Sequence, residues 1–75
     1  MKLYLDDIRN PCQSGYKDDE WAVCRNDKTF KDMFIPFDGI VTHISLDYDL
    51  ADFDSDGNEV TGYDVLKWLC NHILD

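Results

Sequence analysis

The chain has 75 residues, and its 44% hydrophobic and 13% aromatic content predicts one small folded domain over residues 1–75 and excludes a disordered segment. Sixteen acidic and seven basic residues give a net charge of −9, which repels nucleic acid phosphates, so direct nucleic acid binding is not expected. Three cysteines without a C-x-x-C pair argue against a zinc site or a disulfide framework, and no apolar run is long enough for a membrane span, so we expect a cytoplasmic protein.

The first strand is expected at residues 1–5. This short apolar run is closed abruptly by Asp6 and Asp7, which is typical of a buried strand that ends at a polar edge. Residues 8–20 then contain a proline, a glycine and a cluster of charges. This composition predicts a long loop in place of a helix.

A second strand and a helix are expected next. Residues 21–24 read WAVC, which favours a short strand. Asn26 or Asp27 is a suitable N-cap for a helix with apolar residues at helical spacing, and Pro36 is expected to end that helix.

Residues 40–46 form a β-branched run that predicts the central strand of the sheet, ending at Asp47. His43 lies within this run, and we expect it to be packed rather than catalytic. The segment 47–64 carries seven acidic residues and no Lys or Arg. We expect this segment to be a mobile loop that is solvated or neutralised by a cation.

The last helix is expected to begin at Thr61. Asp64, three positions later, completes a capping box with it. The apolar face is expected to consist of Leu66, Leu69, Cys70 and Ile73, widened by Val65 and Trp68.

This order of elements predicts the fold class. Short strands separated by crossovers favour a small α/β domain of two or three layers, with a short, mainly parallel sheet of about three strands and two helices. A sheet of that width leaves an edge exposed, and this edge is able to pair with a second copy, so a homodimer is one expectation.

Three aspartates are the candidate metal ligands. If the strands that end at Asp6 and at Asp47 are neighbours, then Asp6, Asp7 and Asp47 converge at one edge of the sheet. Carboxylates this close repel one another unless a divalent ion joins them, and ligands that are all oxygen suit Mg²⁺ or Mn²⁺. The alternative is that they are ordinary polar residues at strand ends.

A phosphate site is expected at the start of the last helix. Thr61 and Gly62 lie where a helix N-terminus offers backbone N–H groups to an anion. Alternatively, Gly62 only eases the turn into the helix.

A calcium site in the acidic segment is not favoured. Asp52, Asp54, Asp56 and the following glycine copy the first half of an EF-hand loop, but Tyr63 stands where the frame needs a bidentate Glu. We therefore expect Ca²⁺ binding to be unlikely, and Mg²⁺ or Mn²⁺ to be the cofactor.

Three segments carry a family resemblance: LDDIRNP at 5–11, ISLDYDL at 44–50 and TGYDVLKWL at 61–69. Together with Trp21 and Arg25, which lie in the expected interval, they resemble the cyclic-phosphate processing receiver domains. The resemblance implies a receiver-like fold with Asp6 and Asp7 as the acidic pair after the first strand and Asp47 as the acidic residue ending the third. It also places Asp49, Thr61 and Gly62 at motif positions, Asp49 as a further metal ligand and Asp47 as the catalytic position, and implies a ligand with a phosphate ester, such as a cyclic phosphate end of RNA.

Two departures from that family bear on catalysis. Tyr48 stands between Asp47 and Asp49 where the family has histidine, and the chain is expected to lack a following strand with a His-Ser-x-Asn motif. A group suited to proton transfer near pH 7 is then missing.

Two functions are therefore expected as alternatives. In the first, the domain binds a divalent cation and a phosphate-containing ligand. In the second, the chain is a non-enzymatic inhibitor or interaction protein, such as a phage-type anti-defence protein or nucleic acid mimic. Its acidic segment would then occupy a basic protein surface through Asp52, Asp54, Asp56 and Glu59.

Overall fold

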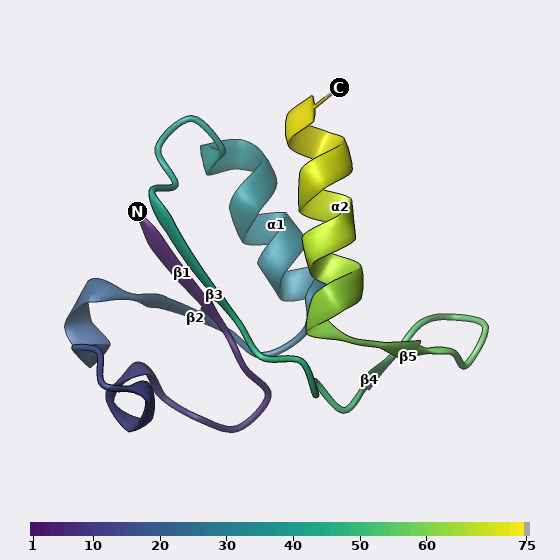
Figure 1. Ribbon diagram of the computed structural model, residues 1–75, viewed down its shortest axis with the longest axis horizontal. Coiled ribbons are helices and arrows are strands. Elements are labelled where there is room, and N and C mark those ends of the chain that lie inside the picture. Colours follow the sequence, from purple (N-terminus) through teal and green to yellow (C-terminus); the bar gives the residue numbers. More distant parts are fainter. Residues whose placement is uncertain (75) are drawn as a thin grey trace.

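The computed structural model describes residues 1–74, which form a three-stranded parallel sheet with two helices (Figure 1). The strands are β1 (Lys2–Leu5), β2 (Ala22–Cys24) and β3 (His43–Leu46), in the order β2-β1-β3. This confirms the α/β receiver-like class. The prediction that residues 40–46 form the central strand is wrong: β1 is central, and β3 is a shorter edge strand whose side chains are only partly buried.

Both helices pack on one face of the sheet, so the domain has two layers of regular structure (Figure 1). Helix α1 spans Asp27–Phe37, and helix α2 spans Gly62–Leu74. The core between the layers is formed by Leu3, Leu5, Cys24, Phe30, Phe34, Leu50, Val65 and Leu69.

The predicted N-cap of α1 is confirmed, but its predicted end is wrong. The side chain of Asn26 accepts a hydrogen bond from the Thr29 amide at 2.8 Å. Pro36 lies inside the helix, which continues to Phe37. Proline removes one hydrogen bond to the carbonyl four residues earlier, and this loss is tolerated in the last turn.

Residues 8–20 contain no α-helix, as predicted, but they include two short 3₁₀ helices, η1 (Pro11–Ser14) and η2 (Asp18–Glu20). A hydrogen bond of 2.8 Å between Tyr4 Oη and Ser14 Oγ fastens this segment to the sheet. Because Tyr4 alternates along β1 with the core residues Leu3 and Leu5, the segment covers the face opposite the helices.

The acidic segment is more ordered than a loop. It contains an antiparallel hairpin of β4 (Asp52–Phe53) and β5 (Glu59–Val60). The carboxylate of Asp54 accepts hydrogen bonds from the amides of Asp56 and Asn58 and closes the turn. Short polar side chains that bond to their own backbone stabilise such turns.

The predicted apolar face of α2 is partly wrong. Val65 and Leu69 are buried, whereas Cys70 is exposed and Leu66 and Ile73 are 46% and 66% exposed. Gly62 accounts for the difference, because it is buried against the end of β3, where an added Cβ would overlap the backbone oxygen of Asp47. This close approach fixes the rotation of the helix so that positions 62, 65 and 69 face the sheet.

Within residues 1–74, no helix has both the length and the apolar character that a membrane crossing requires.

Candidate functional site

The candidate site lies where β1 and β3 end beside each other. After β1 the chain passes through a long loop to β2, which lies on one side of β1. It then passes through α1 to β3, which lies on the other side of β1. The Asp47 amide donates to the Leu5 carbonyl at 2.9 Å and the Asp6 amide donates to the Cys24 carbonyl at 3.1 Å, so both aspartates follow their strands directly. Ligands of open α/β sheets bind at such a change in direction, beyond the carboxyl ends of the strands.

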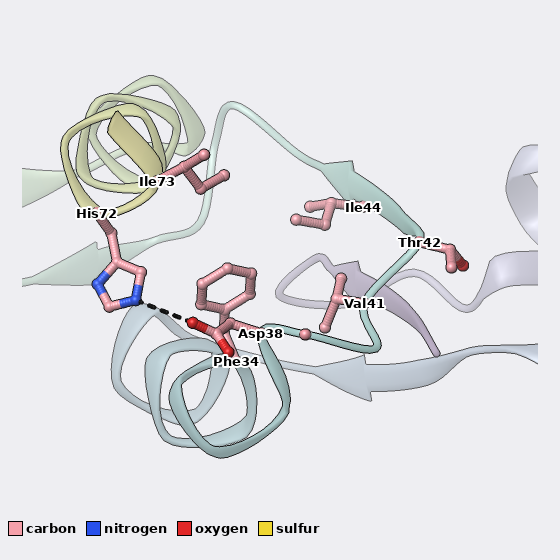
Figure 2. A pocket seen from close by; sticks show the side chains of 8 residues that line it. Phe34, Asp38, Val41, Thr42, Ile44, His72 and Ile73 are labelled. Atoms are coloured by element: carbon pink, nitrogen blue, oxygen red, sulfur yellow. Dashed lines mark ion pairs between the residues drawn. The ribbon is translucent and has the colours of Figure 1, made fainter. Parts of the chain in front are cut away.

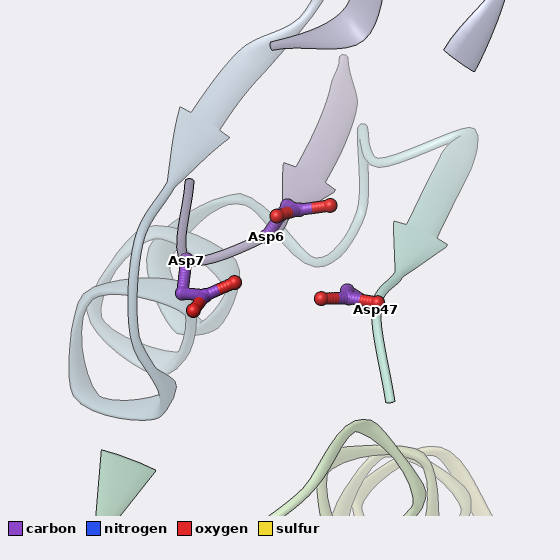
Figure 3. A group of neighbouring side chains, drawn as sticks. All are labelled: Asp6, Asp7 and Asp47. Carbon is purple, nitrogen blue, oxygen red and sulfur yellow. The ribbon is translucent and has the colours of Figure 1, made fainter. Parts of the chain in front are cut away.

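Three carboxylates converge at this point (Figure 3). Asp6, Asp7 and Asp47 each offer an oxygen, and these oxygens all lie within 4.8 Å of one another. Asp6 is 4% exposed, and the other two residues are half-buried. The convergence predicted from the strand ends is therefore present.

Asp6 is held in its ionised form by the loop that follows it. One of its carboxylate oxygens, Oδ1, accepts hydrogen bonds from the amides of Ile8 at 3.1 Å and Arg9 at 3.0 Å. Burial opposes ionisation, but these bonds and the Arg9 charge outweigh it and hold the pKa of Asp6 below its usual value. An ionised oxygen is what a cation requires.

The pKa of Asp47 is shifted in the opposite direction to that of Asp6. Burial first, and then the negative charge of Asp6, raise the pKa of Asp47 above its usual value, and the charges of Asp7 and Asp49 add to the rise. Arg9 opposes the rise only in part. The folded chain therefore carries unrelieved negative charge at Asp47, which a bound cation would relieve.

Two arginines contribute to the site without having been predicted as site residues. The guanidinium of Arg25 donates to the carbonyl oxygens of Asp6 at 3.3 Å and Arg9 at 2.6 Å, and to Asn10 Oδ1 at 2.6 Å. It braces the turn that presents the first acidic pair. Arg9 brings its positive charge to both Asp6 and Asp47. Arg25 is far from the aspartates in sequence, so no local pattern indicates that it contacts the turn after β1. The position of Arg9 just after the acidic pair is a signal that could have identified it as a site residue.

The donors of the predicted phosphate site are bonded internally. The amide of Gly62 donates to the Tyr48 carbonyl at 2.9 Å. The amide and hydroxyl of Thr61 donate to Asp64 Oδ2 at 2.9 and 3.1 Å, and the Asp64 amide donates to Thr61 Oγ1 at 3.3 Å, which confirms the capping box. Phosphate binding at Thr61 and Gly62 stays a prediction, and it requires these donors to share or exchange their acceptors.

The other predicted acidic residues lie outside the three-carboxylate group. Asp49 is exposed, and its Oδ1 accepts the Ala51 amide at 3.3 Å. Its negative charge contributes to the raised pKa of Asp47, but none of its oxygens belongs to the three-carboxylate group. The carboxylates at positions 52, 54, 56 and 59 lie on the β4–β5 hairpin, which extends away from the sheet (Figure 1).

The donor set fits a hard divalent cation. All three groups offer oxygen, and they come from the ends of two neighbouring strands. Mg²⁺ and Mn²⁺ bind carboxylate oxygen and keep several waters, whereas a tight Ca²⁺ site needs more ligands.

The chain matches one family model over residues 1–75, that of the cyclic-phosphate processing receiver domain. No curated protein and no solved structure gave a significant match.

Proposed function

Since this chain belongs to the family of cyclic-phosphate processing receiver domains, we propose that it binds a divalent cation and a phosphate-containing ligand at Asp6, Asp7 and Asp47. The cation is Mg²⁺ or Mn²⁺. The observation that carries the proposal is the approach of three carboxylate oxygens to within 4.8 Å of one another at the strand ends.

The charge balance of the site supports a cation that is shared with a phosphate. Three ionised carboxylates leave net negative charge even after a divalent ion binds, so a phosphate also needs a positive side chain. Arg9 is the nearby basic group, because its charge influences both Asp6 and Asp47. We propose that the ion meets one phosphate oxygen and that Arg9 meets another, since guanidinium binds phosphate with fixed geometry.

Each carboxylate has its own task in this proposal. Asp6, which two backbone amides hold in its ionised form, is the permanent ligand. Asp47 is the ligand whose charge the ion relieves, and it is also the group at the catalytic position of the family. Tyr48, which is 67% exposed, stands where the family has histidine and provides no imidazole for proton transfer. We therefore propose binding as the main activity, with little turnover.

Isothermal titration tests the binding site directly. Mg²⁺ is titrated into the chain, and a nucleoside 2′,3′-cyclic monophosphate is then titrated with and without Mg²⁺. We expect the nucleotide to bind only when Mg²⁺ is present, and both heats to disappear in Asp47→Asn. Asp56→Asn, which removes the same charge from the hairpin, is the matched control and should keep both. Equal heats in Asp47→Asn and wild type would disprove the site.

Hydrolysis of the same nucleotide tests the limit on catalysis. We expect a rate at or near background, because a carboxylate alone is a poor proton-transfer group at neutral pH. Metal-dependent turnover that Asp47→Asn abolishes would restore the enzyme hypothesis.

A second candidate function is supported by the projecting hairpin. Asp56 and Glu59 are exposed at its tip and on β5, on a segment that leaves the body of the domain (Figure 1). Such a surface suits a basic protein partner whose attraction salt weakens. A lysine-rich peptide is the probe: Asp56→Asn combined with Glu59→Gln should reduce its binding, whereas Asp47→Asn should not. Equal binding to all three proteins would exclude the hairpin as the contact.

A further inference from the structure

The backbone around Asp47 is held from two different elements. Asp47 follows β3, which begins at His43, a residue that is exposed and not packed as the sequence predicts. The Asp47 amide donates to the Leu5 carbonyl of β1 at 2.9 Å. On the other side, the Tyr48 carbonyl accepts the Gly62 amide of α2, also at 2.9 Å. The chain segment that carries the Asp47 carboxylate therefore lies between the sheet and the first turn of α2.

Gly62 lies closer to Asp47 than a residue with a side chain could. An added Cβ would overlap the Asp47 carbonyl oxygen, and it would lie 2.8 Å from the carbonyl carbon of Asp47 and 3.2 Å from Tyr48 Cα. Carbon atoms that are not bonded pack at about 3.5–4.0 Å, so even a methyl group does not fit. The backbone at Gly62 does not itself require glycine, because its φ is not positive, unlike that of Gly15 and Gly57. Glycine is needed here for the close approach.

Helix α2 is fixed along its length, so it does not retreat freely from Asp47. Val65 and Leu69 of the helix are buried in the core. At the far end of α2, His72 Nε2 lies 3.7 Å from Asp38 Oδ2, just beyond the end of α1 (Figure 2). A steric overlap at the start of the helix is therefore passed to the neighbouring backbone.

The chain that follows Asp47 is less constrained than the helix. Tyr48 and Asp49 are exposed, and the next residue in the core is Leu50. The peptide between Asp47 and Tyr48 is thus held by β1 on one side and by Gly62 on the other. A displacement of this peptide also displaces the Asp47 Cα and the carboxylate that it carries.

The other two carboxylates of the site are positioned without α2. Asp6 is held by the amides of Ile8 and Arg9, and Asp7 lies in the same turn after β1 (Figure 3). The start of α2 therefore determines where one of the three ligands lies relative to the other two. Metal–ligand distances vary by only about 0.2 Å, so a small displacement of one carboxylate weakens the site.

We propose that Gly62 is a positioning residue of the cation site, and that it holds the Asp47 carboxylate beside Asp6 and Asp7. Gly62 acts through the Asp47 backbone and not as a phosphate donor, because its amide already bonds to the Tyr48 carbonyl. This role rests on the proposed cation binding at the three carboxylates. Coupling is reciprocal, so a bound cation also stabilises the contact between Gly62 and the end of β3.

Isothermal titration with Mg²⁺ tests this role at a temperature where every variant is fully folded. Gly62→Ala should weaken Mg²⁺ binding by roughly 10–100-fold. Val65→Ala removes buried methyl groups from the same helix face, and Gly39→Ala adds a Cβ that meets nothing within 4 Å. Both controls should stay within about twofold of wild type, because lower stability does not change the affinity of a chain that is fully folded.

The titration separates two failures. If wild type and a folded Gly62→Ala bind Mg²⁺ equally, the positioning role is wrong and the cation site stands. If wild type binds no Mg²⁺, the proposed function is wrong and this role falls with it.

Hydrogen exchange tests the same coupling in the wild-type chain, without a substitution that could prevent folding. Saturating Mg²⁺ should slow exchange of the Gly62 amide by roughly fivefold or more, because the ion and the contact favour the same position of Asp47. The Asn58 amide, which donates to Asp54 in the hairpin, is the control and should exchange at an unchanged rate. Mg²⁺ that binds but leaves exchange of the Gly62 amide unchanged would overturn the proposal.

Discussion

In the absence of divalent cations, Asp47→Asn should stabilise the folded chain, although it removes a carboxylate from the centre of the site. Burial and the charges of Asp6 and Asp7 raise the pKa of Asp47 in the folded state. A carboxyl group with a raised folded pKa binds its proton more tightly when folded than when unfolded. Its ionisation therefore lowers stability as the pH rises through the folded pKa, and the whole penalty is present at neutral pH.

The size of the penalty follows from the distances in the site. The carboxylate oxygens of the group lie within 4.8 Å of one another. Two unit charges at this separation repel by about 1 kcal/mol in water, or about 3 kcal/mol at an effective dielectric constant of 20. Asp47 is half-buried and reaches solvent, so the lower figure applies to each neighbour. We expect Asp47→Asn to raise the free energy of unfolding by about 1–2 kcal/mol. For a chain of this size, 1 kcal/mol shifts Tm by roughly 4–8 °C.

Thermal unfolding at pH 7 in EDTA and in Mg²⁺ is the assay. In EDTA the variant should melt above wild type, and below pH 4 the difference should vanish because the Asp47 carboxyl of wild type is then neutral in both the folded and the unfolded state. At a Mg²⁺ concentration about ten times Kd, wild type gains about 1.4 kcal/mol and the variant gains nothing, so the gap closes or reverses. Asp56→Asn should show neither effect. If Asp47→Asn melts below wild type in EDTA, the carboxylate stabilises the native state and the repulsion argument is wrong.

Three further predictions concern the residues that shape the site. Gly62→Ala should lower the free energy of unfolding by about 1–3 kcal/mol or more in urea denaturation, because its Cβ would overlap the Asp47 backbone; Gly39→Ala, where a Cβ meets nothing within 4 Å, should be nearly neutral. Arg25→Gln should weaken Mg²⁺ binding by roughly 10–100-fold in calorimetry by loosening the turn at Asp6, and an unchanged affinity would show that this brace is dispensable. The backbone amide of Thr61 first, and then its hydroxyl, hold the pKa of Asp64 below its usual value, so NMR titration of Thr61→Ala, which removes only the hydroxyl, should move that pKa part of the way upward, and an unmoved pKa would show that the hydroxyl does not contribute.

The sequence predicts the parts of this fold that local patterns determine. Abrupt acidic ends to apolar runs identify β1 and the end of β3, and their parallel pairing brings Asp6 and Asp47 together. The N-cap at Asn26 and the capping box at Thr61 are likewise local hydrogen bonds, and both are present.

The remaining features depend on contacts between distant segments. The order of the strands places β1 in the centre because the long loop and α1 cross opposite faces of the sheet, which no local pattern encodes. The buried face of α2 follows from the approach of Gly62 to the end of β3, and the apolar residues Leu66 and Ile73 are left exposed. Arg25 reaches Asp6 across 19 positions of sequence, so its role emerges only in three dimensions.

Paramagnetic NMR with Mn²⁺ tests the central claim most directly, because the ion broadens the resonances of nuclei close to it. Substoichiometric Mn²⁺ added to the labelled chain should first broaden the amide signals of Asp6, Asp7 and Asp47, and an excess of Mg²⁺ should restore them. Asp47→Asn should remove this selective loss. Broadening centred on the hairpin from Asp52 to Glu59, with the signals of Asp6 and Asp47 unaffected, would contradict the account.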